Sequence, residues 1–151
     1  MSAKLAMIVA EFNRAIVDVM VTAAEAEAKA ANATVHMVVR VPGTYEVPLV
    51  LARALTRNDV DAAIVLGYIE RGETLHGEVM GHVVHAAIID LSLQYKKAVG
   101  IGIIGPGATL AQAEARKDGY ARAAVRAALA LRQAHEAISS GPACSVPEPD
   151  R

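Results

Sequence analysis

The chain is poor in aromatic residues, has one cysteine and contains no long apolar run. Its 151 residues include one phenylalanine, no tryptophan and a single cysteine, Cys144, which excludes a disulfide framework and indicates a reducing compartment. No apolar stretch approaches the roughly 18 residues that a membrane-spanning helix needs. The net charge of −1, without a basic stripe, disfavours nucleic acid as a partner. Lys4 interrupts the first apolar segment, so we interpret it as a strand rather than a signal peptide and expect a cytoplasmic protein.

Apolar residues, by contrast, are abundant and make up 54% of the sequence. A chain of this length forms one domain with a core of moderate size. We therefore expect part of the apolar surface to be covered by other subunits of a homo-oligomer.

Short apolar runs alternate with segments of helical periodicity. The pattern predicts strands at Lys4–Ala10, Thr34–Val39, Asp61–Leu66 and Ala98–Ile104. It predicts helices from Asn13 to Ala31, Tyr45 to Leu55, His76 to Tyr95 and Leu110 to Ala137. Asn13 is expected to cap the first helix, and Thr109 with Gln112 to form a capping box. This order predicts an α/β domain over residues 1–138, with a parallel sheet covered by helices on both faces, and a disordered tail at residues 139–151.

Every strand-to-helix loop of a parallel sheet lies at the same edge, where open α/β sheets bind their ligands. The four loops here are Glu11–Asn13, Val41–Glu46, Gly72–His76 and Gly105–Thr109. Each precedes a helix whose unpaired N–H groups and positive dipole end suit an anion such as phosphate. None matches the P-loop or the dinucleotide fingerprint, which disfavours a nucleoside triphosphate or a dinucleotide.

Several polar and aromatic residues near these loops have two interpretations. Phe12 either packs the entry of the first helix or offers its ring as a stacking platform. Thr44 and Glu46 either cap a helix and complement its dipole or grip a polyol. Arg116 is either a solvated helix arginine or a bidentate phosphate ligand. The residue pattern alone leaves these alternatives open, and the simpler structural role is the commoner one in each case.

His76 is the candidate acid–base group, because it lies among polar residues at a predicted helix start. It ends the segment Arg71–His76, which gathers a base, a glycine, a hydroxyl and an imidazole after a buried strand. His82 and His85 follow on the same helix, but their spacing places them far from His76. We therefore expect no metal site.

Four segments, in this order, resemble lumazine synthase, the penultimate enzyme of riboflavin biosynthesis. They are Ala10–Arg14, Val41–Pro48, Leu66–Gly67 with Gly72–His76, and Gly105–Gly107 with Gln112–Arg116. The similarity extends from about Lys4 to Arg132, and the Gly-Glu-Thr and Gly-Pro-Gly segments are most similar to archaeal members.

This resemblance implies a flavodoxin-like three-layer αβα sandwich with a four-stranded parallel sheet of order 2-1-3-4. It implies condensation of 5-amino-6-(ribitylamino)uracil with 3,4-dihydroxy-2-butanone 4-phosphate to give 6,7-dimethyl-8-ribityllumazine. No cofactor or metal is expected in this family. Its sites lie between the subunits of a pentamer, and some members assemble pentamers into a hollow icosahedral shell.

The resemblance also assigns roles to individual residues. Phe12 would stack on the pyrimidine with Asn13 beside it, and Thr44 and Glu46 would hold the ribityl chain. Other residues expected to line the substrate pocket are Gly43, Tyr45, Tyr68, Ile69, Glu70 and Ile101.

The phosphate end of the second substrate would meet Gly72, Glu73 and Thr74. His76 would move protons during the condensation. Arg116 would bind phosphate in the pocket of the adjacent subunit.

Three features depart from the family pattern. Glu70 stands where an apolar residue usually lines the pyrimidine pocket, and Ile101 replaces a frequent aromatic that closes the pocket from the neighbouring subunit. The segment Lys117–Tyr120 is shorter than the lysine- and glycine-rich stretch of bacterial members, so further phosphate contacts are not assigned there.

Two alternative functions remain at this stage. The first is a flavin- or lumazine-binding or shell-forming homologue with weak catalysis, and Glu70 is its only support. The second is an archaeal-type riboflavin synthase, against which the intact segment Gly72–His76 argues.

Overall fold

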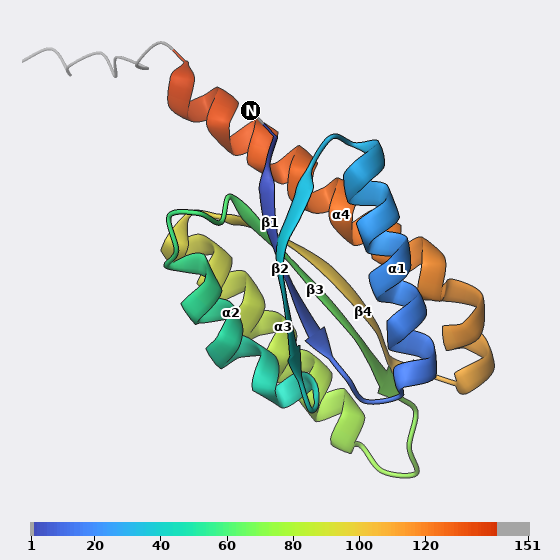
Figure 1. The fold of residues 1–151 in the computed structure, drawn as a ribbon. Coiled ribbons are helices and arrows are strands. Elements are labelled where there is room, and N and C mark those ends of the chain that lie inside the picture. Colours follow the sequence, from blue (N-terminus) through green and yellow to red (C-terminus); the bar gives the residue numbers. More distant parts are fainter. Residues whose placement is uncertain (1, 142–151) are drawn as a thin grey trace, which may run out of the picture.

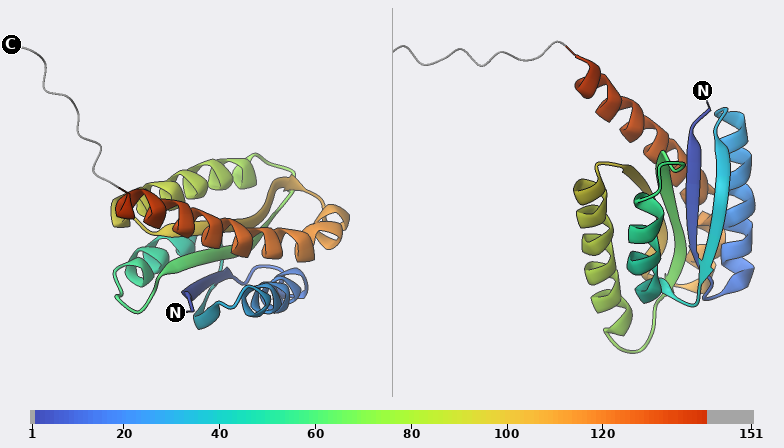
Figure 2. Two further views of the ribbon diagram at one scale, coloured as in Figure 1. Left: turned by 90° about the horizontal axis from the view of Figure 1, so that it is seen from above. Right: turned by 60° about the vertical axis from the view of Figure 1, so that its left-hand side comes forward.

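The computed structural model describes residues 2–141, which form a four-stranded parallel sheet between two pairs of helices (Figure 1). The strands are β1 (Lys4–Ala10), β2 (Thr34–Val41), β3 (Ala62–Glu70) and β4 (Ala98–Ala108), and they lie in the order β2-β1-β3-β4. Helices α1 (Arg14–Ala30) and α4 (Leu110–Ser140) cover one face. A short 3₁₀ helix, η1 (Thr44–Glu46), α2 (Val47–Leu55) and α3 (His76–Tyr95) cover the other (Figure 2). The predicted three-layer sandwich and its strand order are confirmed.

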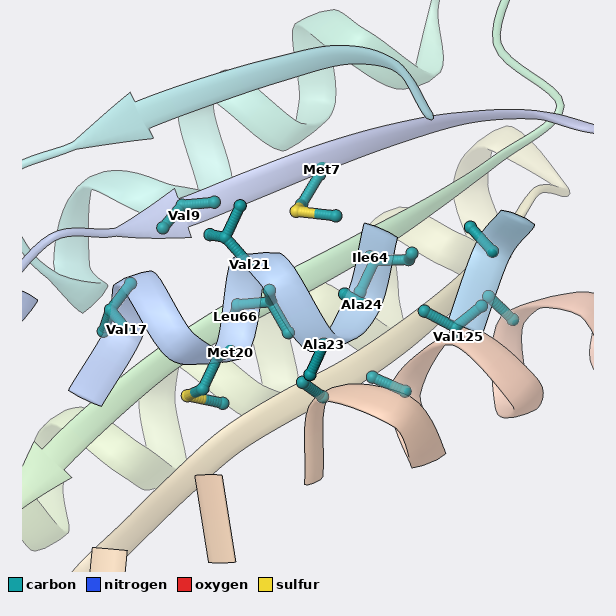
Figure 3. Packing of buried hydrophobic residues seen from close by; sticks show 14 of the residues in the cluster. Met7, Val9, Val17, Met20, Val21, Ala23, Ala24, Ile64, Leu66 and Val125 are labelled. Atoms are coloured by element: carbon teal, nitrogen blue, oxygen red, sulfur yellow. The ribbon is translucent and has the colours of Figure 1, made fainter. Parts of the chain in front are cut away.

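The core consists of two apolar layers, one on each side of the sheet. In β1, Leu5, Met7 and Val9 face the α1 and α4 layer, whereas the alternate residues Ala6 and Ile8 face α2 and α3. A central parallel strand buried on both faces is a continuous apolar run for this reason. Figure 3 shows the first layer, where β1 and β3 residues meet those of α1 and α4: Met7, Val9, Ile64 and Leu66 against Val17, Met20, Val21 and Val125.

The strands extend further toward their carboxyl ends than the sequence pattern predicts. β2 ends at Val41 rather than Val39, and β3 at Glu70 rather than Leu66. The predicted loop Gly105–Thr109 is wrong over most of its length, because β4 continues to Ala108. Gly105 and Gly107 have positive φ, which lets the strand pass an irregularity and pair again, with Glu70 opposite Ala108.

Of the two helix caps that the sequence predicts, one is confirmed and the other is wrong. Thr109 and Gln112 form the expected capping box: the Gln112 N–H donates to Thr109 Oγ1 at 3.3 Å, and the Thr109 N–H donates to Gln112 Oε1 at 2.9 Å. The predicted side-chain cap by Asn13 is wrong. Asn13 is left-handed, with φ 60° and ψ 69°, whereas a capping side chain needs an extended backbone to reach the first-turn N–H groups.

Two other helix boundaries differ in detail. The helix predicted over Tyr45–Leu55 begins as the 3₁₀ turn η1, and α2 follows with Pro48 in its first turn. Ser139 and Ser140, which we expected in the C-terminal tail, are the last residues of α4. The rest of that predicted tail, from residue 142 onward, lies outside the described residues.

Helix α3 is apolar on two opposite sides. Val84 and Ile88 are buried against the sheet, whereas Val79, Val83 and Leu93 are exposed. Even so, within residues 2–141 no helix is long and apolar enough to span a membrane.

The close approach of β4 to α4 gives a testable consequence for stability. A Cβ atom added at Gly100 would overlap the Ala124 carbonyl oxygen, so Gly100→Ala is expected to cost about 3 kcal/mol of unfolding free energy. Gly119 is the matched control, since a Cβ there meets nothing within 4 Å and removing a helix glycine stabilises by about 0.5–1 kcal/mol. Urea unfolding of both variants measures the two effects. Equal stability of Gly100→Ala and the unsubstituted protein would contradict this packing.

Candidate functional site

A cavity of about 580 Å³ lies at the edge of the sheet where β1, β2 and β3 end. Its walls come from the β1 and β2 exits, the end of β3 and the first turns of α3. It brings together most of the residues expected from the sequence: Phe12, Gly43, Thr44, Tyr45, Glu46, Tyr68, Ile69, Glu70, Gly72, Thr74 and His76. Of the four loops predicted to meet at one sheet edge, three contribute residues to this cavity and Gly105–Thr109 contributes none. We call this cavity the sheet-edge pocket.

Phe12 follows β1 directly and borders the pocket. Its side chain remains 52% exposed, although most aromatic side chains in domains of this size are buried. A ring that only packed the entry of α1 would be covered by the helix. Phe12 is instead partly exposed at the border of the pocket, as a stacking platform for a planar ligand would be.

The β2 side of the pocket consists of η1 and the glycine before it. Thr44 is only 3% exposed, is the one buried polar residue of the described chain, and lines the pocket. A Cβ added at Gly43 would lie 3.1 Å from Glu46 Oε2, so the carboxylate folds back over this glycine. Thr44 makes no side-chain helix cap, whereas Glu46 lies in the first turn of η1, as the simpler interpretation of this acid expects.

The end of β3 forms the opposite side. The buried Tyr68 hydroxyl donates a hydrogen bond to the Ala108 carbonyl oxygen at 3.1 Å, and the Arg71 N–H donates to the same oxygen at 2.9 Å. These bonds fasten the end of β3 to the end of β4. Burial, and secondarily the charge of Glu70, raises the pKa of Tyr68 and keeps its hydroxyl protonated as a donor.

His76 is the first residue of α3 and faces η1 across the pocket. Its backbone N–H donates to Thr74 Oγ1 at 3.4 Å, which satisfies one orphan group of the helix start. The Tyr45 ring lies edge-on to the imidazole, with ring centroids 5.9 Å apart. No hydrogen bond to the imidazole is found within residues 2–141, so both ring nitrogens are available to a ligand.

Four predicted site residues do not line the pocket: Asn13, Glu73, Ile101 and Arg116. Ile101 is half-buried in the middle of β4, where it packs against the α2 and α3 layer. Arg116 lies in the second turn of α4, and its guanidinium Nη1 donates a hydrogen bond to the Gln112 carbonyl oxygen at 3.3 Å. Helix α4 covers the face of the sheet opposite α3, so Arg116 is kept out of the pocket of its own chain.

The pocket also contains residues that the sequence analysis did not assign: Pro42, Arg71, Gly77 and Met80. Arg71 belongs to the conspicuous polar segment after β3, and Met80 is one helical turn after His76, so spacing along α3 was a usable signal. Gly77 fits because α3 runs close to β3: a Cβ there would lie 3.1 Å from Ile69 Cγ2.

The other two histidines of α3 contact residues of the same helix. His85 Nδ1 lies 2.6 Å from the Gly81 carbonyl oxygen, and His82 lies 3.8 Å from the Glu78 carboxylate. In the described part of the chain, no three histidine, cysteine, aspartate or glutamate side chains gather as a metal site would require.

Comparison with known proteins gives a consistent result over nearly the whole domain. The family described as 6,7-dimethyl-8-ribityllumazine synthase matches residues 2–136. A protein named 6,7-dimethyl-8-ribityllumazine synthase from Metallosphaera sedula is 42% identical over 140 residues, covering 93% of each chain. Proteins of the same name from Saccharolobus islandicus and Staphylothermus marinus are 42% and 43% identical, over 87% and 83% of this chain and 86% and 83% of theirs.

Proposed function

The chain belongs to the 6,7-dimethyl-8-ribityllumazine synthase family, and we propose that its substrates meet in the sheet-edge pocket. The protein is a transferase of riboflavin biosynthesis. It condenses 5-amino-6-(ribitylamino)uracil with 3,4-dihydroxy-2-butanone 4-phosphate to 6,7-dimethyl-8-ribityllumazine, releasing two molecules of water and one of phosphate. The single observation that supports this location best is that one cavity is lined by the exposed Phe12, by Thr44 and by His76.

The first substrate fits the β1 and β2 side of the pocket. The pyrimidine stacks on the exposed face of Phe12, while the ribityl hydroxyls reach Thr44 and Glu46. Thr44 lines the pocket, and its hydroxyl can both donate a hydrogen bond to a polyol and accept one from it. Glu46 accepts hydrogen bonds from a polyol, because an ionised carboxylate is an acceptor only.

The second substrate fits the α3 side, where the reaction needs proton transfers. The 5-amino group attacks the ketone and a first water leaves to form an imine. Phosphate is then eliminated, the ribitylamino nitrogen attacks the remaining carbonyl carbon, and a second water leaves as the ring closes. His76 lies beside this position and passes protons between these steps. Holding two substrates together contributes much of the remaining acceleration.

The phosphate anchor comes from a second subunit in this proposal. The α3 N-terminus and the loop Gly72–Thr74 offer N–H and hydroxyl groups, but no Arg116 reaches the pocket within one chain. We propose a pentamer in which Arg116 of each subunit enters the pocket of its neighbour. The exposed apolar side of α3 and the excess of apolar residues support an extensive subunit interface.

A mixing assay tests the function directly. Purified protein is given both substrates, and lumazine formation is followed against the slow uncatalysed reaction. We expect a rate far above background. A background rate from folded, assembled protein would favour the flavin- or lumazine-binding alternative, which nothing in the comparisons supports. The cytoplasm remains the expected compartment, on composition alone.

The interface proposal predicts the behaviour of a charged variant of α3. Val83→Glu places a carboxylate on the exposed apolar side and is expected to shift the protein from oligomer to monomer, because burying an unpaired charge costs several kcal/mol. Val19→Glu makes the same change on the exposed side of α1 and is the control. Light scattering of both variants gives the masses. An intact oligomer of Val83→Glu would place the interface elsewhere.

A further inference from the structure

Tyr68 borders the sheet-edge pocket, yet its side chain lies on the α4 side of the sheet. Alternation along β3 places it with Ile64 and Leu66 in the apolar layer under α1 and α4, where it is 1% exposed. Its hydroxyl donates a hydrogen bond to the Ala108 carbonyl oxygen at 3.1 Å. A buried hydroxyl is stable only when it is bonded, so the ring and the end of β4 hold each other in place.

The Ala108 carbonyl group is a junction between the end of β3 and the start of α4. It accepts a second hydrogen bond, at 2.9 Å, from the Arg71 N–H, which continues the pairing of the two strands. Thr109, the next residue, caps α4 through its capping box with Gln112. Only this cap residue separates the end of β4 from Leu110, the first residue of α4. A displacement of the carbonyl group therefore displaces the first turn of the helix.

Arg116 is bonded to this same first turn. Its guanidinium donates to the Gln112 carbonyl oxygen at 3.3 Å, and the Gln112 side chain accepts from the Thr109 N–H at 2.9 Å. Hydrogen bonds and adjacent residues thus form a continuous connection from Tyr68 to Arg116. A guanidinium binds phosphate through two bonds only when its planar fork is correctly placed. The start of α4 decides that placement.

We propose that Tyr68 is a positioning residue for phosphate binding in the neighbouring pocket, because its hydroxyl holds the start of α4 and thereby places Arg116. The inference rests on the proposed function, in which Arg116 of each subunit enters the pocket of its neighbour, and deepens it. Tyr68 touches no reacting group in this role. Loss of its hydroxyl weakens the adjacent pocket rather than the pocket that Tyr68 itself borders.

Tyr68→Phe removes the hydroxyl and keeps the ring in the apolar layer. The KM for the butanone phosphate should rise about fivefold, because a guanidinium that is held less precisely makes weaker phosphate bonds. The KM for the aminouracil and kcat should change little. Tyr95→Phe is the matched control, since Tyr95 is the last residue of α3 and packs against the opposite apolar layer. An unchanged KM for the butanone phosphate in Tyr68→Phe would overturn the inference.

Thr109 provides a test of the next part of the connection. Thr109→Ala removes one half of the capping box and should raise the same KM, whereas Thr109→Ser keeps the capping hydroxyl and should leave it normal. A normal KM in Thr109→Ala would show that the start of α4 does not place Arg116, which contradicts the proposal.

Mixed oligomers show in which pocket Tyr68 acts. Unsubstituted subunits are coexpressed with an excess, about tenfold, of subunits that carry both Tyr68→Phe and His76→Ala. Nearly all turnover then comes from the pockets of unsubstituted subunits, and most of these have a doubly substituted neighbour. We expect the raised KM of Tyr68→Phe, whereas dilution into subunits with His76→Ala alone should give the normal KM. A normal KM in both mixtures would place any effect of Tyr68 in its own pocket and refute the proposal.

Binding of inorganic phosphate separates this inference from the proposed function. In calorimetric titrations, phosphate alone should bind Tyr68→Phe several-fold more weakly than it binds the unsubstituted protein or Tyr95→Phe. Lack of turnover by the unsubstituted protein would contradict the proposed function, and these titrations would still test Tyr68. Equal phosphate affinity of the three proteins would rule out a positioning role for the hydroxyl.

Discussion

His76→Ala is expected to lower kcat about 100-fold while leaving the KM for either substrate within a few-fold of its normal value. The imidazole has room to exchange protons with the reacting nitrogen and carbonyl groups, because neither ring nitrogen is bonded within the described chain. The loss is at the low end for a general acid–base group, since positioning of the two substrates survives the substitution.

Two controls separate chemistry from structure in this variant. His135→Ala removes a histidine from the exposed end of α4, far along the helix from the sheet-edge pocket, and should keep full activity. Free imidazole in the buffer should restore part of the rate of His76→Ala without accelerating the unsubstituted enzyme. A normal kcat for His76→Ala would mean that another group or water carries the protons.

The fold could be predicted from the sequence because its pattern is local and repeated. Apolar runs of strand length alternating with helical periodicity leave little choice other than a parallel sheet with helices on both faces. The strand ends were less predictable. In the sequence, Gly105 and Gly107 predict the end of the fourth strand. In the structure, their positive φ lets β4 continue, so that Ala108 pairs with Glu70.

Site residues in the strand-to-helix loops could be predicted from the sequence. Residues whose position depends on how helices pack against the sheet could not. Thr44 is a sequence-level candidate for a helix cap, and only the structure shows that it is buried without a cap bond. Met80 could have been found from its spacing, one helical turn after His76, whereas the close approach of α3 to β3 at Gly77 is visible only in the packing. The position of Arg116 outside its own pocket follows from α4 lying on the opposite face of the sheet.

Arg116→Ala is expected to raise the KM for the butanone phosphate roughly 50-fold and to change the KM for the aminouracil little. A guanidinium that binds phosphate through two charge-assisted hydrogen bonds contributes about 2–3 kcal/mol, and each 1.4 kcal/mol is tenfold in affinity. Arg132→Ala is the matched control, because Arg132 lies on the same helix but pairs with Glu136 at 2.8 Å. An unchanged KM for the phosphate substrate would remove Arg116 from the site.

Mixed oligomers show whether Arg116 acts in its own chain or in a neighbour's pocket. His76→Ala and Arg116→Ala subunits, coexpressed in equal amounts and purified together through two different tags, are each impaired alone. If the pocket of one subunit takes Arg116 from the next, random mixing gives about a quarter of the sites both intact residues, and activity returns to that level. If Arg116 served its own pocket, every site would lack one of the two residues, and activity would stay at that of the separate variants. Recovery therefore requires a site built from two subunits, as expected if Arg116, which does not line the pocket of its own chain, enters the pocket of a neighbour.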